Sequence, residues 1–328
     1  MVKKLSLSNR FMCYIVLSEN YSITVYLKLF ILFFLFQLMN YKLHCTGIRD
    51  TMVYIYNSPE SENDIRYEYQ WEILKTALEK TKAKYGPYKM IKSMVMSEKR
   101  QSNELMKATK TLSVMYLDTK PEFEKKLIGI HIPVDKNLSG YRIFLIRKVN
   151  KINFYKNLTI KQLKKFTYGL RSEWIDVAIL QYNGFKVVTG SNYEGLFEML
   201  VNKRFDVFLR SSTEIFDELE KRKEQFPDLY IEDSLCIFYP LPMYFWFSKT
   251  KEGKLLAARA EEGMREMIKD GTYNLIFDKY HRYKIEKLNL KNRKIYRIKN
   301  PFLVPETPFN IKKFWFDPHT YNPVKRKK

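Results

Sequence analysis

Three short apolar runs in the middle of the chain end in side chains that can hold an anionic group. The runs cover residues 166–170, 185–188 and 205–209. The residues at and after their ends are small, hydroxylic or basic, and they include Ser191, Asn192 and Arg210. Hydroxyl, amide and guanidinium groups all donate hydrogen bonds to carboxylate or phosphate oxygens. We therefore take these three residues as candidate ligand contacts.

Two amphipathic helices are predicted between these runs. Apolar side chains fall on one face in residues 174–182 and again in residues 193–201. Gly184 stands where the first helix must end, and Ser191 or Asn192 stands where the second must be capped. Strand, helix, strand, helix, strand at this spacing predicts a parallel sheet with right-handed crossovers. In such sheets ligands bind beyond the carboxyl ends of the strands, against helix N-termini.

The residue that directly follows the third run, Arg210, has two interpretations. Its position at a strand exit favours a ligand contact, and a surface charge is the alternative. The pattern Ser211-x-x-Glu214 behind it matches a capping box, so for Glu214 we favour a capping role.

A second α/β region is predicted from residue 52 to residue 147. Its strands are expected at 52–56, 88–96, 111–117, 126–132 and 141–146. Asp64 can cap a helix whose apolar face holds Tyr67, Trp71, Leu74 and Leu78, and another helix is expected from about 98 to 107. Arg100 lies beside the carboxyl end of the 88–96 strand. It is a candidate ligand contact, with a solvated helix charge as the alternative.

Composition excludes some classes of protein. The chain has 328 residues, 45% of them hydrophobic and 16% aromatic, which is not the composition of a disordered protein. The formal charge of +22 is compatible with nucleic-acid binding, because phosphates attract Lys and Arg without sequence specificity. However, the 58 basic residues are spread along the chain among 36 acidic ones. We therefore expect no nucleic-acid partner, and a basic nucleic-acid or membrane-surface protein is kept as an alternative.

The cysteines and histidines give no support for metal or triad chemistry. The three cysteines and four histidines are far apart, and no pair has metal-ligand spacing. No HExxH, CxxC or GxSxG motif occurs. We therefore expect no cofactor and no metal.

Residues 1–47 differ from the rest of the chain. Basic residues precede a segment whose densest part, 29–39, reads LFILFFLFQLM. This length is typical of the apolar core of a signal peptide and is short for a membrane span. We expect a signal peptide or an N-terminal membrane anchor, and therefore a periplasmic or otherwise extracytoplasmic protein.

The end of the chain is expected to return to the first region. Residues 148–157 are a polar connection, and residues 229–248 form an extended apolar run with a kink at Tyr239-Pro240-Leu241-Pro242. That run suits a strand re-entering the first half of the sheet. A helix at 253–268, a short helix at 273–280 and a surface tail at 306–328 follow.

Several motifs occur in the order found in one known family. They are Asp64-Ile65-Arg66-Tyr67, Gly140-Tyr141-Arg142-Ile143-Phe144, Trp174-Ile175-Asp176, Asn183-Gly184-Phe185, the segment 193–200, Arg204-Phe205-Asp206, Tyr239-Pro240-Leu241-Pro242, Glu261-Glu262-Gly263-Met264 and Asn300-Pro301. Over roughly residues 50–305 the chain resembles the type II periplasmic solute-binding proteins, in particular the family 3 group of amino-acid-type ABC transporter substrate-binding proteins.

The resemblance implies an α/β fold of two lobes, each a mixed sheet flanked by helices, joined by two extended crossovers. Lobe 1 would hold 48–147 and 240–305, and lobe 2 would hold 148–239. A small anionic or amino-acid-like solute would enter between the lobes, and closure would bury it. The protein would be a monomer without enzymatic activity that serves a membrane permease or a sensor.

The resemblance also implies roles for particular residues. Amino-acid-binding members hold the two charged ends of the ligand with an Arg and a nearby Asp. Arg100 or Arg210 would supply the first, and no residue was assigned to the second. Tyr56, Tyr116 and Tyr239 would be aromatic walls of the cleft, with a core position as the alternative.

Some relatives of these proteins resemble enzymes of the cyclohexadienyl dehydratase type, which gives another alternative. A lyase of this kind needs a buried acid beside the ligand, for which Glu214, Glu173 or Asp118 are available.

Overall fold

The computed structural model describes residues 28, 30–32, 50–58 and 68–324. The chain divides into two units, Met1–Asp50 and Thr51–Lys328. In the first unit Lys28, Phe30, Ile31 and Leu32 are helical and exposed, and most of the predicted leader lies outside the described residues. Within the described ranges, no helix has the length and apolar character needed to cross a membrane.

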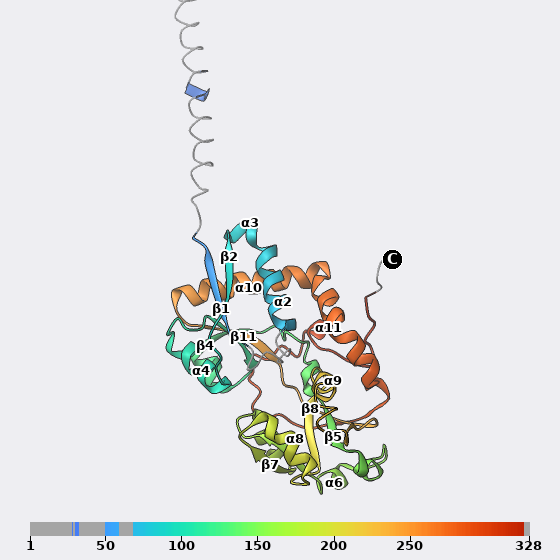
Figure 1. Ribbon diagram of the computed structural model, residues 1–328. Helices are drawn as coiled ribbons and strands as arrows, with labels where there is room; N and C mark the ends of the chain where they lie inside the picture. Colours follow the sequence, from blue (N-terminus) through green and yellow to red (C-terminus); the bar gives the residue numbers. More distant parts are fainter. Residues whose placement is uncertain (1–27, 29, 33–49, 59–67, 325–328) are drawn as a thin grey trace, which may run out of the picture. The chain divides into compact units, whose positions relative to one another are not determined.

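The second unit contains two sheets, and four of the five strands of the first come from residues 52–130 (Figure 1). Its strands, in spatial order, are β2 (Tyr88–Lys92), β1 (Met52–Tyr56), β3 (Val114–Asp118), β11 (Met243–Ser248) and β4 (Leu127–Ile130). β1 pairs in parallel with β2 and β3, whereas β11 is antiparallel to both β3 and β4. This is a mixed sheet, as expected.

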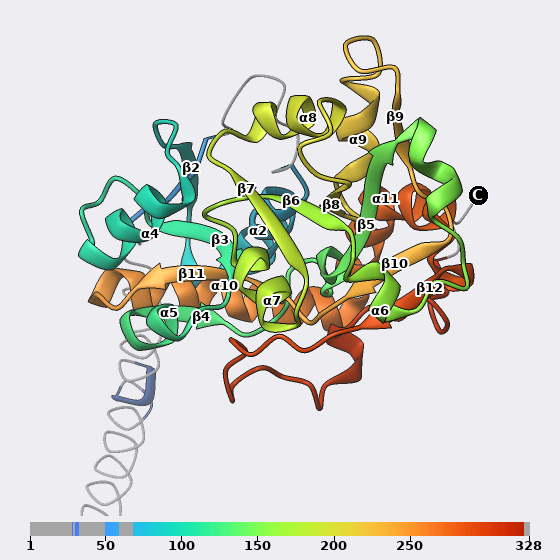
Figure 2. The same ribbon diagram turned by 90° about the horizontal axis from the view of Figure 1, so that it is seen from below.

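The second sheet contains the predicted βαβαβ unit. Its spatial order is β12 (Lys294–Arg297), β10 (Leu235–Phe238), β5 (Tyr141–Arg147), β8 (Val207–Ser211), β6 (Thr167–Arg171) and β7 (Lys186–Gly190), and β9 (Leu229–Ile231) pairs with β5. β6 is parallel to both β7 and β8, which confirms the predicted parallel arrangement. The two crossover helices, α7 (Ile175–Tyr182) and α8 (Tyr193–Val201), cover opposite faces of this sheet (Figure 2).

Three long helices pack together at the first sheet. They are α2 (Glu68–Lys80), α10 (Lys251–Asp270) and α11 (Thr272–Leu288). The predicted apolar face of α2 is confirmed at Trp71, Leu74 and Leu78, which are buried. Gly263 lets α10 approach α2 closely, because a Cβ there would lie 2.0 Å from the carbonyl oxygen of Ala77.

Shorter helices complete the second unit. They are α3 (Lys82–Tyr85), α4 (Glu98–Lys107), α5 (Pro121–Lys126), α6 (Ile160–Leu163) and α9 (Ile215–Glu220), with 3₁₀ turns η1 (Leu138–Gly140), η2 (Lys148–Asn153), η3 (Leu290–Asn292) and η4 (Lys312–Phe314). Thr159 caps α6 through a capping box with Gln162. The capping box predicted from Ser211 and Glu214 is wrong, because Glu214 itself is the N-cap position of α9 and its side chain makes no capping bond.

One strand assignment made from the sequence is wrong. β5 was expected to complete the first half, but it pairs with β8, with Arg142 opposite Ser211, and so belongs to the second sheet. The cause is that local patterns indicate a strand but not its partner, which is set by pairing over long sequence distances. β12, which was not predicted as a strand, is parallel to β10 in the second sheet, although its residues lie in the range expected for lobe 1. That the two lobes open and close as separate bodies remains a prediction.

The extended run 229–248 is three strands divided between the two sheets. β9 and β10 belong to the second sheet, and β11 belongs to the first, so the predicted return across Pro240 and Pro242 is confirmed. The predicted short helix at 273–280 extends as α11 to Leu288. The C-terminal segment was expected on the surface, yet Phe314 and Phe316 are buried in the core.

Candidate functional site

A cavity of about 910 Å³ is bounded by elements of both sheets. The helices and strands of the first sheet contribute Tyr69, Gln70, Tyr116, Met243, Tyr280, His281 and Lys284. The second sheet contributes Arg171, Ser191, Asn192, Tyr193, Glu194, Thr213, Glu214, Asp217, Glu218, Lys221, Arg222 and Gln225. Asp135 and Ser139, from the connection between the sheets, complete the lining. The volume is that of a pocket for a small molecule.

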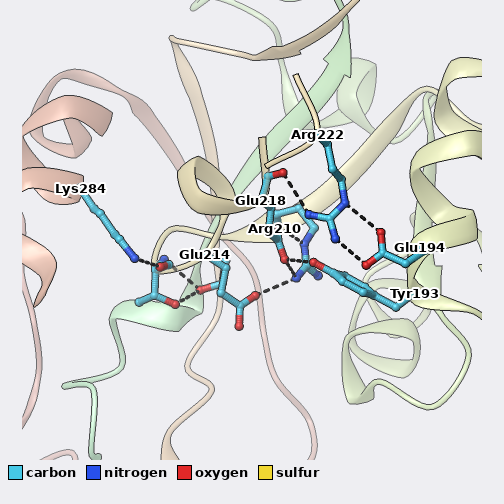
Figure 3. Close-up of polar contacts among 9 residues, drawn as sticks. Tyr193, Glu194, Arg210, Glu214, Glu218, Arg222 and Lys284 are labelled. Atoms are coloured by element: carbon cyan, nitrogen blue, oxygen red, sulfur yellow. Dashed lines mark hydrogen bonds and ion pairs between the residues drawn. The ribbon is translucent and has the colours of Figure 1, made fainter. Parts of the chain in front are cut away.

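We call one side of the cavity the charged wall; Tyr193, Glu194, Glu214, Glu218 and Arg222 line the cavity there (Figure 3). The wall also includes Arg210 at the end of β8, which is not among the lining residues but is bonded to two of them. Its Nε donates to Glu218 Oε2 at 2.7 Å, and its Nη2 donates to Glu214 Oε2 at 2.8 Å and to Glu218 Oε1. The Tyr193 hydroxyl also donates to Glu218 Oε1. The guanidinium is thus enclosed by carboxylates of its own chain.

Aromatic rings surround the same guanidinium. The Arg210 Cζ lies 4.7 Å from the ring centre of Trp174 and 4.9 Å from that of Phe208. Burial lowers the pKa of Arg210, but the nearby Glu218 and Glu214 carboxylates outweigh it and raise that pKa above its usual value. Arg210 is therefore charged, buried and bonded to carboxylates through Nε and Nη2.

A second guanidinium on the charged wall is paired in the same way. Arg222 Nη2 donates to Glu194 Oε1 at 2.6 Å and Nε to Glu194 Oε2 at 3.0 Å, a bidentate arrangement visible in Figure 3. Its Nη1 donates to the backbone oxygen of Glu218 at 3.0 Å. Arg222 thereby joins α8 to α9.

Lys284 connects the first sheet's helices to this network. Its Nζ donates to the backbone oxygen of Thr213 at 2.7 Å and to the carboxylate of Asp217. Since Lys284 is on α11 and Asp217 is on α9, this pair bridges the elements of the two sheets across the cavity. Nearby, Lys287 on α11 lies 4.6 Å from the ring centre of Phe216 on α9.

A second part of the cavity lining, which we call the neutral wall, consists of Tyr69, Gln70, Ser139 and His281. Tyr69 donates its hydroxyl proton to Val134 O at 2.7 Å. In contrast, Gln70 Nε2, Ser139 Oγ and both ring nitrogens of His281 have no hydrogen-bond partner in the described part of the chain. These side chains belong to residues that are 2%, 9% and 4% exposed, so bulk solvent does not satisfy them either.

The imidazole of His281 is held by aromatic rings. Its ring centre lies 4.4 Å from that of Tyr69 on α2 and 5.0 Å from that of Phe277 one turn earlier on α11. Burial, together with the positive charge of Lys284, lowers the pKa of His281 to about 3. At neutral pH the ring is therefore uncharged and offers one donor and one acceptor.

Ser139 is positioned by the turn that crosses between the sheets. Its backbone N–H donates to Asp135 Oδ2 at 2.8 Å. The following residue, Gly140, lies so close to Tyr239 that a Cβ would be 2.5 Å from the Tyr239 carbonyl oxygen. Burial raises the pKa of Asp135, despite the hydrogen bonds it accepts from Ser139 and Asn137.

The structure separates the residues that we proposed as ligand contacts. Ser191 and Asn192 line the cavity, and the Asn192 side chain caps α8 by accepting from the Gly195 N–H at 3.2 Å, as predicted. Arg100 lies on α4 with its side chain 53% exposed and 3.8 Å from Glu104, outside the set of described residues that line the cavity. Arg100 and Arg210 therefore do not come together in this structure.

Of the three tyrosines proposed as aromatic walls, only Tyr116 lines the cavity. Tyr56 is half-buried, with its ring centre 4.8 Å from that of Trp71. Tyr239 is fully buried and donates to Asp176 Oδ1, which also pairs with Arg142 at 2.8 Å. For both, the core alternative describes their surroundings.

The carboxyl groups considered for an enzyme have other surroundings. Glu214 holds Arg210, and Glu173 pairs with Arg171 at 3.4 Å. Asp118 is buried, and burial raises its pKa. Among the described residues, no group of three or more His, Cys, Asp and Glu side chains is arranged to hold a metal ion.

Gln70, Ser139 and His281 were not predicted as site residues. Gln70 lies within the buried part of α2, next to residues assigned to the apolar face. His281 lies one residue beyond the predicted end of its helix. A polar residue inside an apolar helical pattern is the signal that could have identified Gln70.

Comparison with known proteins identifies the fold. No protein-family model matches the sequence, and no curated protein does. An ancestral arginine-binding protein solved with glutamine shares 15% sequence identity with this chain, covers 72% of it and 99% of its own length, and has a TM-score of 0.50. An ancestral arginine-binding protein solved with arginine shares 15% sequence identity with this chain, covers 72% of it and 100% of its own length, and has a TM-score of 0.48.

A third structure is the substrate-binding protein of an amino acid ABC transporter. It shares 14% sequence identity with this chain, covers 70% of it and 99% of its own length, and has a TM-score of 0.47. At these identities the likeness concerns the fold. The chain has the two-lobed α/β fold of type II periplasmic binding proteins, as the sequence motifs predicted.

Proposed function

We propose that this protein is an exported, non-enzymatic solute-binding protein that holds a small amino-acid-like solute in the cavity between the two sheets. The observation that carries the proposal is the cavity itself. It is about 910 Å³ in volume, it is bounded by both sheets, and it exposes both signs of charge beside buried polar groups that lack partners within the described chain. A solute that contacts both sides stabilises a closed form over an open one.

The charges of the lining favour an amino-acid-like solute over a simple anion. A zwitterion presents both signs of charge, and both signs are present in the lining. A simple anion needs cations that are available to it. Arg210, Arg222 and Lys284 are each bonded to carboxylates of the chain.

A solute screen tests the proposal. The purified protein is heated with single amino acids, small carboxylates such as succinate and citrate, and short peptides. A solute present at 100 times its Kd stabilises the folded protein by about 2.7 kcal/mol, so at least one amino acid should raise the melting temperature clearly. Stabilisation by the carboxylates alone would contradict the amino-acid-like class, and stabilisation by no compound would contradict solute binding.

A pair of variants tests the location. In Ser191→Trp a large side chain enters the cavity lining, so binding of the amino acid found in the screen should be weakened. Arg100→Trp places the same side chain on the exposed face of α4, outside the described lining, and binding should be unchanged. Equal affinities of the two variants, measured by calorimetry, would argue against this cavity.

Export is part of the proposal, and it rests on the apolar segment 29–39. When the full chain is produced in a bacterium, the protein should be recovered outside the inner membrane. If the segment acts as a cleaved signal peptide, the chain should be shortened by ~45 residues. Full-length protein confined to the cytosol would contradict export. In its own membrane system the protein would deliver its solute to a permease or report it to a sensor.

A further inference from the structure

The neutral wall contains hydrogen-bonding capacity that the described chain does not use. Gln70 Nε2, Ser139 Oγ and the two ring nitrogens of His281 are buried and unpartnered within the described residues, and all three residues line the same cavity. A buried polar group without a partner destabilises the folded state. All three residues line one cavity, and a bound molecule that reaches these atoms can satisfy them.

The charges around the neutral wall disfavour a charged group at this position. Lys284, whose positive charge acts on His281, is already bonded to Asp217 and to Thr213 O. Asp135, which accepts from the Ser139 N–H, is a buried carboxyl, so a second carboxylate beside it would be repelled. An ammonium group would have to approach a histidine that has a lysine beside it on the same helix.

The types of the unpartnered atoms define the group that fits. Gln70 Nε2 is a donor only, Ser139 Oγ donates and accepts, and a neutral His281 ring offers one donor and one acceptor. The matching group must therefore be uncharged and must both accept and donate hydrogen bonds. A carboxamide meets this requirement with its oxygen and its NH₂, and a hydroxyl meets it with one atom.

We infer that Gln70, Ser139 and His281 form a subsite for an uncharged carboxamide or hydroxyl group at one end of the solute. This inference rests on the proposed function, and it narrows the solute to an amino acid with a polar, uncharged side chain. The charged ends of the solute are then directed to the rest of the cavity, where both signs of charge are present.

A panel of matched amino acids tests the subsite by calorimetry. L-Glutamine and L-asparagine carry a carboxamide, and L-serine and L-threonine carry a hydroxyl. L-Glutamate has the shape of glutamine with a charge, and L-methionine has a similar length without a hydrogen-bonding side chain. The best binder should come from the first four, and it should bind at least about tenfold more tightly than its charged or apolar counterpart.

Two variants should show opposite effects on stability and on binding. Gln70→Leu and His281→Phe replace an unpartnered polar group with an apolar one of similar size. Each should raise the melting temperature of the ligand-free protein by about 2 °C or more. Each should also weaken binding of the best polar amino acid by about tenfold or more, while any methionine binding is not weakened.

Tyr273→Phe is the matched control. Its buried hydroxyl donates to Pro133 O at 2.7 Å and to Val134 O at 2.6 Å, and Tyr273 is outside the described lining of the cavity. Removing a partnered hydroxyl should lower the melting temperature and leave affinity unchanged. This control distinguishes a group that awaits a ligand from one that only supports the fold.

The outcomes separate the inference from the proposed function. If amino acids bind but glutamine, glutamate and methionine bind equally well, the subsite is absent and the proposed function stands. If Gln70→Leu and His281→Phe lower the melting temperature and leave affinity unchanged, these groups are satisfied by ordered water, and the inference is wrong. If no amino acid binds, the proposed function fails and the subsite fails with it.

Discussion

The two walls of the cavity satisfy their polar groups in opposite ways. On the charged wall, Arg210 is bonded to Glu218 and Glu214, and Arg222 is bonded to Glu194. On the neutral wall, Gln70 and His281 have buried polar atoms without a partner in the described residues. The charged wall therefore uses its strongest groups to fix its own structure, whereas the neutral wall leaves weaker groups open to a ligand.

This difference shows that charge is a poor guide to ligand contact when its partners are unknown. For Arg210 to bind a solute carboxylate, it would have to release Glu218, exchanging one carboxylate for another and leaving a buried charge unpaired. A neutral group without a partner has nothing to release. A hydrogen bond from a ligand to His281 or Gln70 is therefore a net gain.

The largest loss of stability is expected when the central cation of the charged wall is removed. Arg210→Ala leaves the buried Glu218 carboxylate without its cation, and we expect a loss of about 3–5 kcal/mol in the free energy of unfolding. Urea denaturation measures this loss. Arg210→Met combined with Glu218→Leu removes both charges and should recover much of it. A single variant as stable as the parent would show that the pair is solvated, and the contrast between the walls would disappear.

The neutral wall should respond to acid through His281. Its pKa is lowered to about 3 in the folded protein, below the usual value of 6.5. Between these values the unfolded chain binds a proton that the folded chain refuses, so stability is complete above pH 6.5 and falls as the pH decreases. The loss is about 1.4 kcal/mol of unfolding free energy per pH unit.

His281→Phe removes this contribution. Below pH 6.5 the free energy of unfolding of the variant should fall less steeply than that of the parent protein, while the carboxylates contribute equally to both. Denaturation at pH 7, 6 and 5 measures the difference. Parallel curves would mean that His281 becomes protonated in the folded state, which would end the description of this wall as neutral.

Loss of the contacts that Lys284 makes to Thr213 and Asp217 should have an intermediate effect on stability. Lys284→Met removes the hydrogen bond to Thr213 O and the ion pair with Asp217. The side chain of Lys284 is 18% exposed and that of Asp217 is 35% exposed. We expect a loss of about 1–2 kcal/mol. Because Lys284 also lowers the pKa of His281, that pKa should rise in the variant, which histidine NMR titration can follow. An unchanged pKa would show that the two walls are electrically independent.

The smallest effect is expected outside the cavity. Arg100 is half exposed and faces Glu104 at 3.8 Å, so Arg100→Ala should change the free energy of unfolding by less than about 0.5 kcal/mol. The same denaturation series as for Arg210 measures it. A loss comparable to that of Arg210→Ala would mean that burial does not separate these two arginines in their energetic roles.

Local periodicity was sufficient to predict much of the fold. The parallel strands β6, β7 and β8 follow from short apolar runs separated by amphipathic helices, and the return of β11 follows from the two prolines before it. Strand partners were not predictable in the same way. β5 was predicted as a strand and β12 was not, and only their pairing with β8 and β10 places them in the second sheet.

The residues of the candidate site could also be predicted only in part. Ser191 and Asn192 were predicted because a strand end and a helix cap are local features, and both line the cavity. Arg210 was predicted from its position at a strand exit, but its partners Glu214 and Glu218 come from the next helix. Gln70 stands out in the sequence as a polar residue inside an apolar helical pattern, but the missing partners of Gln70 and His281 are a property of the folded chain.

The position of β11 in the middle of the first sheet has a consequence for synthesis. β3 ends at Asp118 and β4 begins at Leu127, yet the two are joined only through β11, which starts at Met243. A growing chain therefore completes β5, β6, β7 and β8 before the strand that closes the first sheet exists. Until Met243–Ser248 has left the ribosome, β3 and β4 carry unpaired edges that can recruit other chains into aggregates.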